Sequence, residues 1–341
     1  TVHRLHRVIG AGRPGVTSRI PVGVIGVGAL GRHHARHLSL HPGVQLVGVY
    51  DAAPARAAEI ASQVGTEAFT ELDALLDRVR GVSIAAPTSF HHGIGVRVLE
   101  RRIGILMEKP VTVTVAEADD LIARAAAAGV PLQVGQIERF NRAVRAAEPA
   151  VHQPRFIECE RLAPFSVRGS DVSVVLDLMV HDLDLALHLT GNAAAVDVRA
   201  DGGALLSPSI DLANARIEFA GGAVASITAS RLARSRVRRT RIYQADGYLS
   251  LDLTAGTAEF TRLRGGWRPG QPAQSIDEVV ERVALSATES DALGLEIGYF
   301  VDALAGRTSG GVSGAEGRAA LALARQVEDA VARAPIVPAA R

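Results

Sequence analysis

The chain has 341 residues, and at about 150 residues per domain this length favours two domains. Lysine and arginine together number 37 against 36 acidic residues, so the net charge of +1 excludes the global basic field of a nucleic-acid binder, and no nucleic-acid partner is predicted. Hydrophobic residues make up 48% of the chain, which excludes a disordered composition, and its single cysteine excludes an intrachain disulfide.

Residues 1–19 carry four arginines and no acidic residue, but they lack the apolar stretch of a secretory signal. They are predicted to form a basic tail. No run of about 18 apolar residues is free of charges and glycine clusters, so no membrane span is predicted. Together with the lone Cys159, these features predict a soluble, cytoplasmic protein.

Residues 20–138 alternate short apolar runs with helical segments, which is the pattern of βαβ units. Strands are predicted at 22–26, 44–50, 81–86, 104–108 and 131–135. Helices are predicted between them at 29–40, 53–64, 90–102 and 114–128. This part of the chain is therefore predicted to be a doubly wound α/β domain with a parallel sheet.

Residues 139–341 follow a different pattern and are predicted to form a second, α+β domain. An apolar helix at 172–190 precedes β-like segments at 193–200, 208–219, 222–231, 236–245, 248–253 and 256–263. Because strands follow strands, we expect a large, open and mostly antiparallel sheet. Two helices, 288–306 and 314–333, close the chain, the second with Ser313 as its N-cap.

The first predicted strand ends in a glycine motif and leads directly into a helix, which is the context that dinucleotide binding requires; the motif is Gly26-Val27-Gly28-Ala29-Leu30-Gly31. Gly26 permits the tight turn, Gly28 lets the backbone approach a pyrophosphate, and Gly31 allows close helix–strand packing. Asp51, 20 residues further on, can bind ribose hydroxyls and would repel a 2′-phosphate. The motif predicts NAD, with NADP less favoured; the alternative is a glycine-rich turn that binds another ligand.

Further candidates follow the third and fourth strands, whose carboxyl ends should border the cofactor crevice. Ala86, Thr88 and His91 follow the third strand and are predicted to contact ribose or nicotinamide. Glu108 and Lys109 end the fourth, where the ammonium could stabilise an alkoxide as a hydride leaves. Pairing of Lys109 with an acidic neighbour is an equally good interpretation.

The predicted helix 172–190 is mostly apolar but carries one stripe of ionisable residues, Asp177, His181, Asp184 and His188. Asp177 and His181 are one turn apart, so the carboxylate could orient the imidazole for proton exchange with an alcohol. The alternatives are the solvated side of an amphipathic helix and a metal site. Because no further ligands are identifiable, no metal is predicted.

Together these motifs resemble the Gfo/Idh/MocA oxidoreductases from about residue 21 onward. The matching pieces are the glycine motif, Asp51, Ala-Pro-Thr with His91, Glu108-Lys109-Pro110, and Asp177 with His181. The resemblance implies an N-terminal Rossmann domain and a C-terminal open sheet whose outer face makes a homodimer or homotetramer. It also implies that Lys109, Asp177 and His181 face the nicotinamide, with His181 as general base and Lys109 polarising the reacting oxygen.

Segments 134–141 and 175–182 look most like nucleotide-sugar 3-dehydrogenases, although Gln136 stands where those relatives carry His and Arg142 where they carry Pro. Arg139, Asn141 and Arg168 border the predicted site and could bind hydroxyls or a diphosphate. Six arginines within 231–241 are interpreted as an exposed sheet face, with an interface or an anionic substrate left open.

We therefore predict an NAD-dependent dehydrogenase that oxidises a secondary hydroxyl of a sugar or nucleotide sugar, such as the 3-hydroxyl of a UDP-N-acetyl sugar. One alternative is a regulator that binds NAD(H) and a sugar without catalysis. The other is a dehydrogenase of the same family that acts on inositol or a simple aldose.

Overall fold

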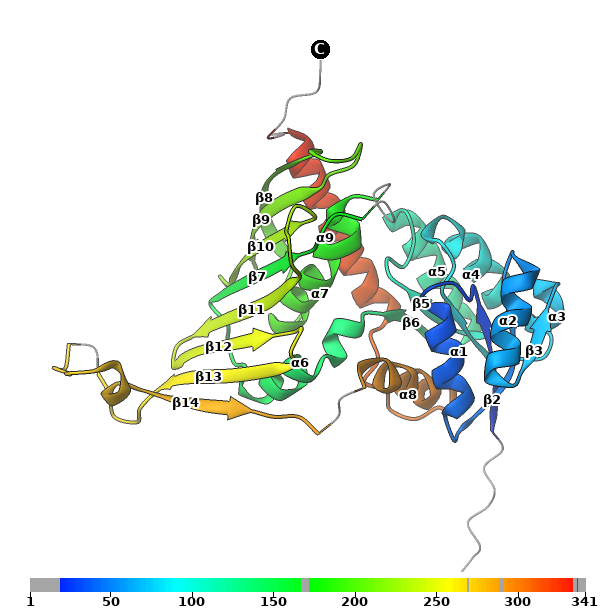
Figure 1. Cartoon of the computed structure of the whole chain (residues 1–341), viewed down its shortest axis with the longest axis horizontal. Helices are drawn as coiled ribbons and strands as arrows, with labels where there is room; N and C mark the ends of the chain where they lie inside the picture. The colour runs from blue at the N-terminus through cyan, green and yellow to red at the C-terminus, as the bar shows by residue number, and fades with distance from the viewer. Residues whose placement is uncertain (1–18, 167–171, 269, 289–290, 334–335, 337–341) are drawn as a thin grey trace, which may run out of the picture.

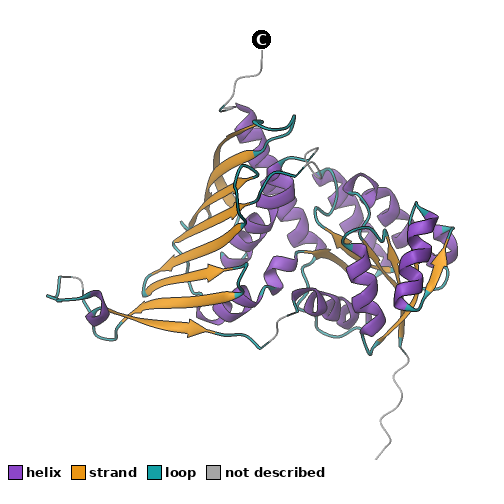
Figure 2. Cartoon of the chain, in the orientation of Figure 1, coloured by secondary structure: helices purple, strands orange, loops and turns teal. Residues whose placement is uncertain are grey.

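The computed structural model describes residues 19–166, 172–268, 270–288, 291–333 and 336. Figures 1 and 2 show two sheets side by side, each with helices packed against it. In the described ranges, no helix combines the length and the apolar character needed to cross a membrane.

The first sheet has six parallel strands in the order β3-β2-β1-β4-β5-β6. The strands are β1 (Ile20–Ile25), β2 (Val44–Tyr50), β3 (Glu67–Phe69), β4 (Gly81–Ile84), β5 (Gly104–Glu108) and β6 (Leu132–Gly135). This is the Rossmann order, in which the chain reverses between β1 and β4 and leaves a crevice at the strands' carboxyl ends. The predicted doubly wound fold is confirmed.

The predicted helices of this domain begin and end close to their expected bounds; they are α1 (Gly31–Leu40), α2 (Pro54–Val64), α4 (His91–Glu100) and α5 (Val115–Ala128), and α3 (Leu72–Leu76) lies between α2 and α4. Local signals explain the bounds of α5. Thr114 Oγ1 accepts from the Glu117 N–H at 3.2 Å, and Glu117 accepts from the Thr114 N–H at 2.9 Å, which forms a capping box. Gly129, with φ of 69°, ends the helix. The short elements β3 and α3 were not predicted.

The second sheet has eight strands in the order β14-β13-β12-β11-β7-β10-β9-β8. All neighbours are antiparallel except β7 and β10. The strands are β7 (Phe156–Leu162), β8 (Ala195–Gly203), β9 (Leu212–Phe219), β10 (Val224–Ser230), β11 (Val237–Gln244), β12 (Gly247–Asp252), β13 (Thr257–Leu263) and β14 (Val280–Leu285). The mostly antiparallel sheet is confirmed, whereas β7 and β14 were not predicted.

Helices cover only one face of this sheet. In Figures 1 and 2, α6 (Arg142–Ala147), α7 (Val180–Leu189) and α9 (Gly314–Arg333) lie between the two sheets, and no helix of the described chain covers the opposite face. Ser313 caps α9 as predicted, because its hydroxyl accepts from the Glu316 N–H at 3.3 Å. The predicted helix 172–190 is in fact a π-helical turn, η4 (Val175–Met179), followed by α7.

Helix α8 (Ala292–Leu304) packs with the first sheet, although it follows the second in sequence. Its Ile297 and Phe300 share one buried apolar cluster with Val22 and Val24 of β1. The contact is close, since a Cβ on Gly81 would lie 2.4 Å from a Leu304 methyl carbon. A domain boundary after residue 138 stays a prediction, but residues 292–304 pack with the predicted first domain.

Candidate active site

The turn between β1 and α1 has the shape that a dinucleotide requires. Gly26 has φ of 82°, a left-handed conformation that favours glycine. A Cβ on Gly31 would lie 1.8 Å from the Gly26 carbonyl oxygen, so only glycine allows this packing. A Cβ on Gly28 would meet nothing within 4 Å, so the space beside its backbone is open. This open turn at the start of a helix fits a pyrophosphate.

Asp51 follows β2 and is only 6% exposed. Its Oδ2 accepts from the Val27 N–H at 2.9 Å, and its Oδ1 accepts from the Ala53 N–H at 2.9 Å. Arg56 Nη1 lies 3.2 Å from Oδ1, with its side chain half exposed. The carboxylate thus joins the β1 and β2 loops, and its oxygens can accept hydrogen bonds from ribose hydroxyls.

Ala86 and Thr88 lie at the same edge, after β4, but the His91 side chain is not available to a cofactor. It is 1% exposed, with Nε2 2.8 Å from the Ala86 carbonyl oxygen and Nδ1 3.0 Å from the Pro110 carbonyl oxygen. Burial lowers the pKa of His91, despite these backbone contacts. His91 connects the β4 and β5 loops, which corrects its predicted contact with ribose or nicotinamide.

Glu108, at the end of β5, is held by a buried hydrogen-bond chain. Its Oε1 lies 2.9 Å from His34 Nε2, and His34 Nδ1 lies 2.8 Å from Ser83 Oγ. Burial raises the pKa of Glu108, but the His34 hydrogen bond and the Lys109 charge outweigh it, so the pKa lies below its ordinary value. Because His34 holds this carboxylate, the Lys109 ammonium is left for other contacts.

Lys109 reaches from β5 to the π-helical turn of the second domain. Its Nζ donates to the Asp177 main-chain oxygen at 2.7 Å and lies 3.6 Å from Asp177 Oδ1. Arg231 Nη2 donates to Asp177 Oδ2 at 3.0 Å. Burial lowers the pKa of Lys109, although Asp177 and Glu108 oppose this effect. The structure therefore joins Lys109 to Asp177, and π-helical turns are frequent at functional sites.

His181 is the second residue of α7 and its imidazole is neutral at neutral pH. Burial, with Lys109 and Arg161 nearby, holds the pKa of His181 well below its ordinary value. Its Nδ1 is buried and has no hydrogen-bond partner among the described residues. The expectation that Asp177 orients this ring is wrong: the π-turn breaks the four-residue spacing, and Lys109 and Arg231 contact the carboxylate instead.

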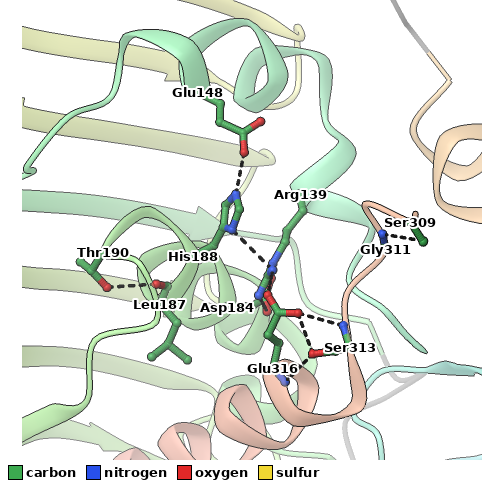
Figure 3. Close-up of polar contacts among 10 residues, drawn as sticks. All are labelled: Arg139, Glu148, Asp184, Leu187, His188, Thr190, Ser309, Gly311, Ser313 and Glu316. Carbon is green, nitrogen blue, oxygen red and sulfur yellow. Dashed lines mark hydrogen bonds and ion pairs between the residues drawn. The ribbon is translucent and has the colours of Figure 1, made fainter. Parts of the chain in front are cut away.

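The other two members of the predicted stripe belong to an internal ionic network (Figure 3). Arg139, 7% exposed, donates to both oxygens of Asp184 at 2.7 Å and to Glu316 at 2.6 Å. His188 Nε2 lies 2.9 Å from Glu148 Oε1. Because acidic side chains of this network occupy the Arg139 guanidinium, Arg139 is not free to bind a substrate, which corrects that prediction.

Asn141 is also used within the fold. Its Oδ1 accepts from the Ala143 N–H at 3.0 Å and caps α6. Its Nδ2 donates to the Leu253 carbonyl oxygen at 2.9 Å and to Glu138 at 3.1 Å. Asn141 therefore caps α6, and its contact with a substrate stays a prediction. The third substrate candidate, Arg168, lies outside the described residues.

Three arginines of the second sheet lie at this site; Arg161 was not predicted, whereas Arg231 and Arg238 belong to the run for which contact with an anionic substrate was left open. Arg161 of β7 is buried and donates to Asp182 and Glu138, each at 2.8 Å. Arg238 of β11 lies 3.3 Å from Glu138 and is 40% exposed. Arg231 follows β10 and is 4% exposed. The arginines of 231–241 are therefore not all on an exposed sheet face.

The composition of the chain also singles out Lys109. Lys109 is the only lysine among the 37 lysine and arginine residues of the chain. Arginine cannot be deprotonated in proteins, whereas a buried lysine readily changes its pKa. The one titratable amine on a side chain thus stands at the edge of the crevice.

Comparisons with known proteins agree with this geometry. Residues 20–136 match the model "Oxidoreductase family, NAD-binding Rossmann fold", and residues 143–250 match "GFO/IDH/MocA C-terminal domain". The UDP-N-acetylglucosamine 3-dehydrogenase of Acidithiobacillus ferrooxidans is 41% identical over 310 residues, which cover 91% of this chain and 96% of that protein. A solved structure of that enzyme superposes with a TM-score of 0.85 at 40% identity, over 92% of this chain and 97% of its own.

More distant relatives share the fold. The scyllo-inositol 2-dehydrogenase (NAD(+)) of Bacillus subtilis is 30% identical over 227 residues, which cover 61% of this chain and 66% of that protein. The structure of GenD2 from gentamicin A biosynthesis in complex with NAD has a TM-score of 0.77 at 22% identity, over 94% of this chain and 97% of its own. The chain belongs to the Gfo/Idh/MocA family of NAD-binding oxidoreductases.

Proposed function

We propose that this protein is an NAD-dependent dehydrogenase that oxidises the 3-hydroxyl of a UDP-N-acetyl sugar, with UDP-N-acetylglucosamine as the first substrate to test. The observation that carries the proposal is the convergence of Lys109, Asp177 and His181 at the end of β5, in the sheet whose β1 leads into the glycine turn. The substrate class comes from the 41% identical relative, which spans nearly the whole chain.

Residues of the first domain would hold the cofactor. Amides of residues 26–31 suit the pyrophosphate, and Asp51 suits the adenosine ribose. Ala86, Thr88, Glu108 and Lys109 lie at the carboxyl edge of the same sheet and would border the nicotinamide half. When bound, NAD supplies the hydride acceptor.

His181 and Lys109 would handle the proton and the charge on the reacting oxygen. The neutral His181 imidazole takes the proton of the substrate hydroxyl as general base. The Lys109 ammonium donates a hydrogen bond to the same oxygen and stabilises its developing negative charge. Asp177 places this ammonium, since Nζ donates to its main-chain oxygen.

Positive charge beside His181 favours an anionic substrate over a neutral polyol. Arg238 is 40% exposed, and within the described part of the chain its guanidinium forms one ion pair, of 3.3 Å with Glu138. Its charge acts on His181, as do those of Arg161 and Lys109. A half-exposed guanidinium beside His181 suits the diphosphate of a nucleotide sugar, whereas inositol has no anionic group for it to bind.

To test this, the cofactor content of the purified protein is first measured after denaturation. Fresh protein is then incubated with NAD and, separately, with UDP-N-acetylglucosamine, free N-acetylglucosamine or myo-inositol. We expect loss of two hydrogens only from the UDP-sugar, and transfer of deuterium to NAD from substrate deuterated at C3. His181→Ala should lower turnover about 10²- to 10⁴-fold with NAD binding retained. Turnover of inositol alone would refute the proposed substrate and favour an inositol dehydrogenase. NAD binding without any product would favour a regulator that binds NAD(H) without catalysis.

We also propose that copies of the chain associate through the uncovered face of the second sheet. This face carries charges of both signs, such as Glu158 and Arg241, whose side chains lie 3.5 Å apart. A self-complementary surface of this kind suits a homodimer or homotetramer. Light scattering at micromolar concentration tests this, and a monomer would overturn it.

A further inference from the structure

Arg231 is a buried side chain that joins the end of β10 to the π-helical turn. Its N–H donates to the Asp211 carbonyl oxygen at 2.9 Å, which places the backbone. Its Nη1 donates to the Val172 carbonyl oxygen at 2.7 Å, and its Nη2 donates to Asp177 Oδ2 at 3.0 Å. The guanidinium therefore holds both the segment before the turn and the carboxylate within it.

Two cations share the Asp177 carboxylate, one at each oxygen. Arg231 binds Oδ2 directly, whereas Lys109 Nζ stays 3.6 Å from Oδ1, beyond hydrogen-bond distance. The hydrogen bond that Lys109 makes goes to the Asp177 main-chain oxygen at 2.7 Å. The ammonium thus lies beside the carboxylate without closing onto it, and it has two further N–H donors.

We propose that Arg231 is a positioning residue: by holding Oδ2 it keeps the Asp177 carboxylate from closing onto Lys109, so that the ammonium stays directed at the reacting oxygen. This inference rests on the proposed function, in which Lys109 contacts that oxygen. Arg231 itself touches neither substrate nor cofactor in this arrangement and acts only through Asp177.

The position of the carboxylate changes the titration of Lys109. The charged and titratable groups that act on Lys109 come from β5, η4 and β7 and are Glu108, Asp177 and Arg161, and His181 of α7 lies beside them. Without Arg231, Asp177 keeps Lys109 as its remaining cation partner and can turn toward it. A closer anion favours the charged amine, so the pKa of Lys109 should rise from its lowered value.

The single lysine makes this shift directly measurable. Protein grown with ¹³C-labelled lysine shows one lysine Cε signal, whose chemical shift follows protonation of Lys109. We expect Arg231→Gln to raise the titration midpoint of Lys109 by about one pH unit. The shift should be seen both in the protein as purified and in the presence of saturating NAD. The matched control is Arg97→Gln, which removes a half-exposed arginine of α4 that pairs with Asp73, away from both the site and the uncovered sheet face.

Kinetics supply the second readout. Arg231→Gln should lower kcat about 10- to 100-fold, with the KM values for NAD and sugar nucleotide nearly unchanged. Asp177→Asn should cancel the effect of Arg231→Gln on the Lys109 midpoint, because the carboxylate through which Arg231 acts is gone. A folded Arg231→Gln protein whose Lys109 midpoint and kcat match those of Arg97→Gln would overturn the inference.

If Arg231→Gln does not fold, Arg231→Lys tests the inference instead. It keeps the positive charge but cannot bind the Val172 carbonyl oxygen and Asp177 Oδ2 at the same time as the guanidinium does. It should fold, lose kcat and keep KM; wild-type kcat in this variant would overturn the inference. Because the titration needs no substrate, a shifted midpoint in an enzyme that oxidises none of the panel would refute the proposed substrate and leave the role of Arg231 standing.

Discussion

Replacing Arg139 separates the role that the sequence suggested from the role that the structure gives it. A substrate ligand on the surface would raise KM and leave stability unchanged. In the structure, Arg139→Met instead removes the guanidinium that neutralises Asp184, whose side chain is 1% exposed, and that also binds Glu316. We therefore expect a large loss of stability, with KM for the sugar nucleotide unchanged.

The size of this loss follows from the geometry. Arg139 makes two hydrogen bonds of 2.7 Å to Asp184 and one of 2.6 Å to Glu316. Removal of one partner of a buried ion pair leaves an uncompensated charge and costs about 3–5 kcal/mol. At about 2–4 °C per kcal/mol for chains somewhat shorter than this one, the unfolding midpoint should fall by on the order of 10 °C.

The loss should also depend on pH. Burial raises the pKa of Asp184 and the Arg139 hydrogen bond opposes this, so the variant carboxyl should have a still higher pKa. An acid whose folded pKa lies above its unfolded value destabilises the fold when it is charged, and a fall in pH relieves that penalty. In the wild type, burial raises the pKa of Glu316, but the hydrogen bonds from Arg139 and from Ser313 together outweigh it and lower that pKa to about 2. This stabilising contribution is fully present above pH 4.5 and fades only as the pH falls from there toward about 2, so it does not change between pH 8 and pH 5.5.

Urea unfolding at pH 8 and pH 5.5 measures both effects. The free energy of unfolding of Arg139→Met should lie well below that of the wild type at pH 8, and the gap should narrow at pH 5.5. Arg97→Met, which removes a half-exposed arginine that pairs with the exposed Asp73 in the first domain, is the matched control. An Arg139→Met deficit equal to that of the control, or one independent of pH, would refute the role of the ionic network.

Three further predictions concern the crevice. Gly31→Ala places a Cβ 1.8 Å from the Gly26 carbonyl oxygen and should abolish NAD binding or folding. The control Gly93→Ala, where the added Cβ meets open space, should raise the free energy of unfolding by about 1 kcal/mol. Calorimetry measures NAD binding and thermal unfolding measures the stability of each variant. Asp51→Ser should raise the preference for NADP over NAD at least about tenfold, because Arg56 loses its acidic partner; equal ratios of kcat/KM in variant and wild type would contradict this. The acid limb of kcat/KM should lie below about pH 6.5, since a lowered His181 pKa keeps the base neutral into acid; a limb at or above that pH is incompatible with His181 as the base.

The first sheet and its cofactor turn were predictable because their constraints are local. Gly26 and Gly31 are needed by the backbone itself, and the apolar runs of β1 and β5 are short enough to exclude helices. The strand β7 was missed because its sequence, Phe-Ile-Glu-Cys-Glu-Arg-Leu, places charges on both faces, and one of them, Arg161, is buried among acidic partners.

The site was only half predictable, for a related reason. Lys109 and His181 follow from motif and position, but the partners of Asp177 do not. Arg231 is 54 residues from Asp177 and, in the ionic network, Glu316 is 177 residues from Arg139. Pairings at such separations have no periodicity that a single sequence reveals. The π-turn likewise follows no residue pattern and moves Asp177 out of the four-residue spacing with His181.

The return of α8 to the first domain has a consequence for biosynthesis. Phe300 and Val301 complete the apolar cluster around β1, and yet the ribosome makes them after most of the second domain. The nucleotide-binding half therefore cannot reach its final packing until residue 304 has left the exit tunnel. Its β1–α1 layer exposes apolar surface throughout that interval, which is when a nascent chain is most exposed to aggregation. A truncated chain that ends after residue 138 would keep this exposed surface permanently.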